Sequence, residues 1–159
     1  MPNYWIAVSG EANFEKTRQL NFELQGFKIR QRRKAERMAD GDKLIWYITK
    51  EMAFAGYATI TGPYFEDHEP IWEGKKGAAA GKPAEDYPWR VPIRKELVLE
   101  RDDWIDVEGI ARKMTYVSKW PAEHWRLAFQ GNLHDIPEED FERIKTALEE
   151  TAAKAKAKA

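Results

Sequence analysis

Two runs of β-forming residues that are apolar on both faces, residues 43–49 and 53–61, constrain the fold of this chain most. The first has the sequence KLIWYIT and the second AFAGYATIT. A strand with two apolar faces is covered on both sides, so we expect the two runs at the centre of a sheet or in a barrel. Gly56, inside the second run, predicts a bulge or a close approach of another backbone segment.

Further strands and helices are predicted around this pair. Residues 4–9 favour a buried strand, and residues 89–99 favour a strand in which Pro92 fits only an edge or a bulge. We expect helices at residues 13–20, capped by Asn13, at 106–114, at 121–127, and from Pro137 to about Leu148. This mixture predicts an α+β domain built on a small, strongly twisted sheet or barrel.

Length and composition limit the class of protein. The chain has 159 residues, and we expect one domain at residues 1–150 and a disordered Lys/Ala-rich tail at residues 151–159. Cysteine is absent, which excludes disulfides, a thiol nucleophile and a thiolate zinc site. No apolar run approaches the roughly 20 residues of a membrane helix, and we expect no signal peptide. These features predict a soluble, cytoplasmic, monomeric protein that does not bind membranes.

The charges are balanced in number but unevenly distributed. Lys and Arg number 26 against 27 Asp and Glu, so the net charge is −1. Residues 28–37, which we call the basic segment, hold six basic residues and one acidic residue, whereas residues 135–150 hold seven acidic and two basic ones. The basic segment is either a solvated surface or a patch that contacts nucleic-acid phosphates. Its candidate phosphate-binding residues are Lys28, Arg30, Arg32, Arg33, Lys34 and Arg37.

The aromatic residues, 13% of the chain, form two groups. Trp5, Trp46 and Trp125 stand in apolar segments, where a position in the core is the simplest interpretation. The second group stands in or beside connections rich in Pro, Gly or charge, and it consists of Trp72, Tyr87, Trp89 and Trp120. Each of these side chains could belong to a small satellite core. Together with the basic segment, they favour a stacking pocket for a planar ligand such as a base.

Residues with catalytic chemistry are scarce. Serine occurs only at Ser9 and Ser118, and the phosphate-loop, dinucleotide, HExxH and GxSxG motifs are absent. His68 has Glu66 and Asp67 beside it, which permits a metal site, although a solvated acidic turn is the better interpretation. We therefore expect a binding protein without a cofactor or metal rather than an enzyme.

Six segments occur in an order that resembles one family. They are YWIAVS at residues 4–9, RMADGDKL at 37–44, AGYA at 55–58, YPWRV at 87–91, FQGNL at 129–133 and IPEEDF at 136–141. Together they resemble EVE-domain proteins of the PUA-like superfamily, of the small stand-alone prokaryotic type, related to ASCH and YTH domains. The resemblance implies a twisted, mostly antiparallel PUA-like β-barrel flanked by short helices, with a C-terminal helix.

The resemblance also implies a function, namely binding of nucleic acid, DNA or RNA, with a flipped and modified base in an aromatic-lined pocket. Gln25 stands where relatives often carry a Trp, which leaves Trp72 as the best stacking candidate, supported by Tyr87 and Trp89. The base pocket implied in this way consists of Ser9, Gly10, Asn13, Gln25, Phe27, Trp72, Tyr87 and Trp89.

Three alternatives remain open at this stage. The same pocket could hold a free nucleobase or nucleotide, in which case binding would depend little on salt. A metal near His68, Glu66 and Asp67 could support hydrolysis. The acidic C-terminal helix could also be a contact surface for a partner protein.

Overall fold

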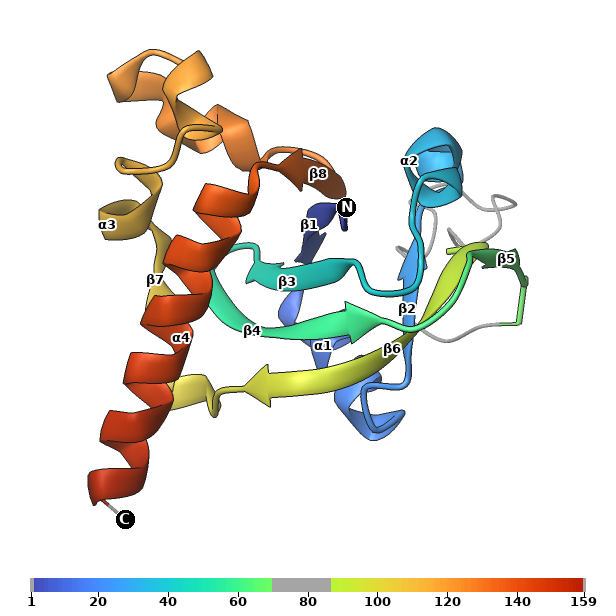
Figure 1. Ribbon diagram of the computed structural model, residues 1–159, viewed down its shortest axis with the longest axis horizontal. Helices are drawn as coiled ribbons and strands as arrows, with labels where there is room; N and C mark the ends of the chain where they lie inside the picture. The colour runs from blue at the N-terminus through green and yellow to red at the C-terminus, as the bar shows by residue number, and fades with distance from the viewer. Residues whose placement is uncertain (1, 70–86, 159) are drawn as a thin grey trace, which may run out of the picture.

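The computed structural model describes residues 2–69 and 87–158, in which one curled sheet carries helices on both faces (Figure 1). The strands are β1 (Tyr4–Ser9), β2 (Leu24–Phe27), β3 (Lys43–Ile48), β4 (Ala53–Ile60), β5 (Phe65–Glu66), β6 (Trp89–Val98), β7 (Ile105–Asp106) and β8 (Leu133–Ile136). The α-helices are α1 (Glu11–Gln19), α2 (Arg32–Glu36), α3 (Val107–Ala111) and α4 (Glu138–Lys158). Short 3-10 helices are η1 (Ile29–Gln31), η2 (Arg101–Asp103), η3 (Val117–Lys119) and η4 (Ala122–Phe129).

The strand order is β2-β6-β4-β3-β1-β8, with β5 added to β6 and β7 added to β4. Strands β1 and β3 run parallel, because α1, β2 and α2 lie between them in the chain and bring it back to the same end. The other strand pairs of the described residues are antiparallel. The predicted α+β fold with a twisted, mostly antiparallel sheet is confirmed.

Strands β3 and β4 occupy the centre of the sheet and are buried on both faces, as their composition predicts. On one face Ile45 and Phe54 pack in a cluster with Ile144 of α4. On the other face Trp46 packs in a second cluster with Phe14 of α1. Alternate residues of a strand point to opposite faces, so each strand contributes to both clusters.

Gly56 marks both a bulge and a close backbone approach. The β3–β4 register shifts between Trp46 and Tyr47. A Cβ atom at Gly56 would lie 2.3 Å from the carbonyl oxygen of Leu97 in the neighbouring strand β6. Only a residue without a side chain allows β4 and β6 to approach this closely.

Two local predictions differ from the structure. Pro92 lies in β6, which is an interior strand between β2 and β4 rather than an edge. The strand accommodates it because the backbone of Pro92 faces the end of β4: its carbonyl accepts from Thr61 N (3.0 Å), just beyond the last paired residue, Ile60. The first helix begins at Glu11 with Gly10 at its N-cap, so Asn13 lies inside the helix and does not cap it.

The predicted disordered tail is helical in the structure, because α4 continues to Lys158. Alanine and lysine are strong helix formers, and Ala152 packs against the same cluster as Ile144. Thus the C-terminal helix is longer than its pattern of large apolar residues indicates. In the described part of the chain, no helix combines the length and apolar character needed to cross a membrane.

Candidate nucleic-acid interface

The basic segment is folded into η1 and α2 and is bonded to the chain around β8. The backbone N–H of Lys28 donates to Asn132 Oδ1 (3.1 Å), and Lys34 Nζ donates to the carbonyl of Leu133 (2.7 Å). Arg37 forms an ion pair with Asp135 (2.5 Å between Nη2 and Oδ2). These three contacts hold a segment too short to be a stable helix by itself in one orientation against the sheet.

Four of the six predicted phosphate-binding residues therefore fall into two groups. Lys34 and Arg37 serve the attachment to β8, and burial lowers the pKa of Lys34. Arg30 and Arg33 are exposed and form no ion pair with any residue that the structure describes. Their guanidinium groups are available to an external anion.

Arg32 lies over an aromatic ring. Its guanidinium carbon is 5.3 Å from the ring centroid of Trp89, and its Nε pairs with Glu36 Oε1 at 3.0 Å. The indole N–H of Trp89 donates to the carbonyl of Ile29 (2.7 Å), and Trp89 is only 7% exposed. In this conformation Trp89 supports the guanidinium of Arg32 and fixes the start of the basic segment, instead of offering an open face to a base.

Tyr87 and Asn13 form a second contact beside Trp89. Asn13 Nδ2 donates to Tyr87 Oη across a separation of 3.3 Å. The structure thus brings Asn13 of α1 into contact with Tyr87, which stands two residues before Trp89 at the start of β6.

Ser9 and Gly10 directly precede α1, with Gly10 one helical turn before Asn13 and farther along the sheet from the basic segment. Ser9 pairs with Ile48, at the C-terminal end of β3. The basic segment leads into the other end of this strand, which begins at Lys43. Gly10 lines a cavity of about 510 Å³ whose charged lining residues are Glu11, Lys50 and Glu51, an acidic balance that does not favour a phosphate. The structure does not bring these two predicted pocket residues together with the basic segment.

Gln25 and Phe27 are part of the protein interior. Gln25 is 2% exposed, and its Oε1 accepts the indole N–H of Trp46 at 2.9 Å. Phe27 is fully buried in the cluster around Trp46. Gln25 thus satisfies a buried donor in the core, which accounts for a polar residue at this position. The predicted stacking residue Trp72 lies outside the described residues.

Arg90 is a feature that the sequence analysis missed. Its side chain is buried, and it donates from Nε to the carbonyl of Tyr87 (3.1 Å) and from Nη2 to the carbonyl of Glu69. Asp67 lies 3.5 Å from Nη1 and balances part of its charge. Because a buried guanidinium needs such partners, Arg90 fixes the backbone of Tyr87 relative to β5. An arginine within the otherwise apolar first half of β6, WRVPI, was the available signal.

Comparison with known proteins assigns the family. The sequence model of the EVE domain matches residues 3–147. The chain belongs to the EVE-domain family. A UPF0310 protein of the archaeon Pyrococcus abyssi is 25% identical over 149 residues, which are 92% of this chain and 99% of the relative.

Solved structures share the fold of this EVE domain. The Mmi1 YTH domain in complex with RNA superposes with a TM-score of 0.62 at 10% identity, over 92% of this chain and 81% of that one. The YTH domain of Zygosaccharomyces rouxii MRB1, solved with N6-methyladenosine RNA, gives 0.62 at 14% identity, over 92% and 86%. A protein from Pseudomonas putida gives 0.59 at 15% identity, over 91% and 98%. These similarities confirm the predicted PUA-like fold.

Two histidines of this EVE domain are in contact with neighbouring polar side chains. His68 Nε2 lies 2.9 Å from Glu66 Oε2 on the exposed surface, and the described residues contain no cluster of three side chains that could hold a metal. His134 is buried, and its Nδ1 lies 2.8 Å from Tyr116 Oη. Burial, together with the positive charge of Lys34, lowers the pKa of His134 to about 4. His134 is therefore neutral near neutral pH.

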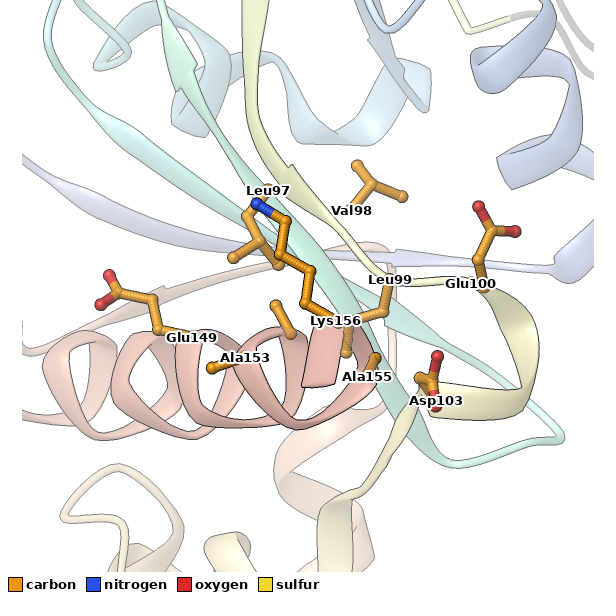
Figure 2. Close-up of a pocket in the computed structure, with 10 residues that line it drawn as sticks. Leu97, Val98, Leu99, Glu100, Asp103, Glu149, Ala153, Ala155 and Lys156 are labelled. Atoms are coloured by element: carbon orange, nitrogen blue, oxygen red, sulfur yellow. The ribbon is translucent and has the colours of Figure 1, made fainter. Parts of the chain in front are cut away.

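A larger cavity, of about 630 Å³, lies between the end of β6 and the C-terminal half of α4. Figure 2 shows the carboxylates of Glu149, Glu100 and Asp103 around it, with the side chain of Lys156 running toward Leu97. Three carboxylates against one ammonium group repel a phosphate backbone, so this cavity is not part of the candidate nucleic-acid interface.

Proposed function

We propose that this EVE domain binds single-stranded nucleic acid, DNA or RNA, through the basic segment, and accommodates a flipped, modified base beside Tyr87. Arg30 and Arg33 contact phosphates, and Arg32, supported by Trp89, contributes the third cation of the same surface. The mechanism is recognition and involves no chemical step.

The observation that carries this proposal is the arrangement of the three exposed arginines. Arg30 and Arg33 are exposed and without ion pairs in the described chain, on a segment that three contacts hold in place. Because the backbone of this segment is already held in place, binding a phosphate requires only the arginine side chains to be ordered. The fold shared with YTH domains that were solved with RNA supports the same conclusion.

The proposal for the base depends on the pair formed by Asn13 and Tyr87. Their amide and hydroxyl groups, 3.3 Å apart, can hydrogen-bond to the edge of a base that has left its stack. Trp72, predicted from sequence to stack on the base, is the third component. A methyl group on the base would add about 0.8 kcal/mol if it enters an apolar recess, which is about a fourfold gain in affinity.

The test measures binding of fluorescently labelled single strands by anisotropy at low salt. Four matched strands are used, RNA and DNA, each with a central adenine or N6-methyladenine. Wild type should bind at least one strand, and Trp72→Ala and Asn13→Ala should weaken the preference for the methylated base without removing phosphate binding. If no strand binds, the proposed function is wrong. If a free nucleobase binds equally well at all salt concentrations, the protein is a small-molecule binder instead.

A further inference from the structure

A cavity of about 350 Å³ lies among the helical turns between α3 and β8, and nothing above assigns it a role. It is lined by Arg112, Val117, Ser118, Trp120, Ala122 and Trp125. These turns lie on the opposite side of the molecule from α2 and β5 (Figure 1). The cavity is therefore separate from the candidate nucleic-acid interface.

The tryptophan N–H groups distinguish this cavity from the rest of the molecule. The structure describes six of the seven tryptophans, and four of them donate their indole N–H to a protein oxygen. Those four are Trp5, Trp46, Trp89 and Trp104, with donor–acceptor distances of 3.0, 2.9, 2.7 and 3.1 Å. The other two, Trp120 and Trp125, have no acceptor in the described chain, and both line this cavity. Trp125 is only 4% exposed as a whole residue, but its indole nitrogen is not among the buried unpaired polar atoms of the described chain, so this N–H is accessible to water or to a ligand.

Two arginines, Arg112 and Arg126, lie at this cavity, and one of them is paired with a carboxylate. Arg112 lines it and uses one nitrogen, Nη2, to bond Glu108 Oε1 (3.2 Å), which leaves most of its donors unoccupied in the described chain. The guanidinium of Arg126 lies 5.4 Å from the ring centroid of Trp125. No carboxylate is among the lining residues. Such a site favours a hydrogen-bond acceptor with negative charge.

We propose that this cavity binds a small aromatic carboxylate. The ring lies against the indoles of Trp120 and Trp125, and the carboxylate accepts from Arg112 and from an indole N–H. The volume suits one or two fused rings, and the combination of aromatic walls with a few convergent donors is typical of a ligand site. The ligand's carboxylate supplies a hydrogen-bond acceptor to indole N–H groups that have none in the described chain.

The test uses nuclear magnetic resonance, because each tryptophan side chain gives one indole N–H signal. The probe is 2-naphthoate, and 2-naphthamide is its neutral control. Trp120→Phe and Trp125→Phe identify two of the signals by their disappearance. We expect 2-naphthoate to shift those two signals saturably, in about the millimolar range expected for a ligand of this size. The signals of Trp5, Trp46, Trp89 and Trp104 should stay in place.

Arg112→Gln should weaken 2-naphthoate binding by about tenfold or more, because an ionic hydrogen bond is lost. Arg94→Gln is the matched control, since Arg94 is also exposed and paired with a glutamate, Glu96 at 2.9 Å, and it should bind as wild type does. The four unaffected indole signals report that each variant is folded.

Three results would overturn the proposal: no saturable shift, equal binding of 2-naphthamide, or an unchanged affinity in Arg112→Gln. A variant with Arg30→Gln and Arg33→Gln should keep its affinity for 2-naphthoate whether or not it binds nucleic acid. Failure of this proposal can therefore be distinguished from failure of the proposed nucleic-acid binding.

Discussion

Replacing Arg30 and Arg33 by Gln should remove most of the salt dependence of nucleic-acid binding. Both side chains are exposed and have no ion pair in the described chain, so the double variant should leave the free energy of unfolding nearly unchanged. Arg32 stays in place over Trp89. The perturbation thus changes the number of phosphate contacts and little else.

The magnitude follows from counting contacts. Three arginines that each neutralise one phosphate of a single strand give a slope of log K against log salt of about −2, since each contact contributes about −0.7. Between about 50 and about 200 mM salt the affinity of wild type should fall about twentyfold. With one arginine left, the slope becomes about −0.7 and the fall about threefold.

The assay is anisotropy of a labelled single strand at a series of salt concentrations. The control is the double variant Arg143→Gln and Lys154→Gln, which removes two exposed cations from α4, and it should keep the wild-type slope. A wild-type slope near zero, or equal changes in slope for both double variants, would show that Arg30 and Arg33 do not contact phosphates.

Three predictions concern stability, measured by urea unfolding. Gly56→Ala should cost about 3 kcal/mol, because the new Cβ would collide with the backbone oxygen of Leu97, whereas Gly109→Ala, in open space on α3, should gain up to about 1 kcal/mol. Asp42→Ala should lower the free energy of unfolding by about 2 kcal/mol or more, because the buried carboxylate accepts the indole N–H of Trp5 at 3.0 Å. An unchanged free energy of unfolding would show that this hydrogen bond does not stabilise the fold. The folded protein holds His134 neutral with a pKa of about 4 against 6.5 when unfolded, so the unfolded state binds more protons between these values. Stability should therefore fall by about 3 kcal/mol from about pH 7 to about pH 4, and His134→Gln should remove that part of the decline.

The local features of the fold could be predicted where the cause lies within one segment. The two apolar faces of β3 and β4 and the role of Gly56 follow from the residues of those strands alone. The end of α4 was predicted wrongly, because the expectation relied on large apolar residues. Alanine and lysine prolong a helix by propensity, and Ala152 packs on the core without a large side chain.

The candidate site could be predicted only in part, because the fates of its residues depend on distant partners. The basic segment was recognisable by its charge. Arg37 forms an ion pair and Arg33 does not, because Arg37 lies beside Asp135. These two residues are 98 positions apart in the chain. Gln25 likewise accepts a hydrogen bond from the indole N–H of Trp46, and no sequence pattern near Gln25 predicts that bond. Non-local hydrogen bonds of this kind follow only once the sheet order is known.

The position of β1 in the sheet has a kinetic consequence. Strand β1 lies between β3 and β8, so the first strand of the described residues is paired with their last one, for example Tyr4 with Ile136. During synthesis one edge of β1 stays unpaired until β8, at residues 133–136, has been made. The sheet therefore depends on non-local contacts, which form slowly compared with those of a helical bundle of the same length. A chain interrupted before β8 would expose the apolar edge of β1 and should aggregate.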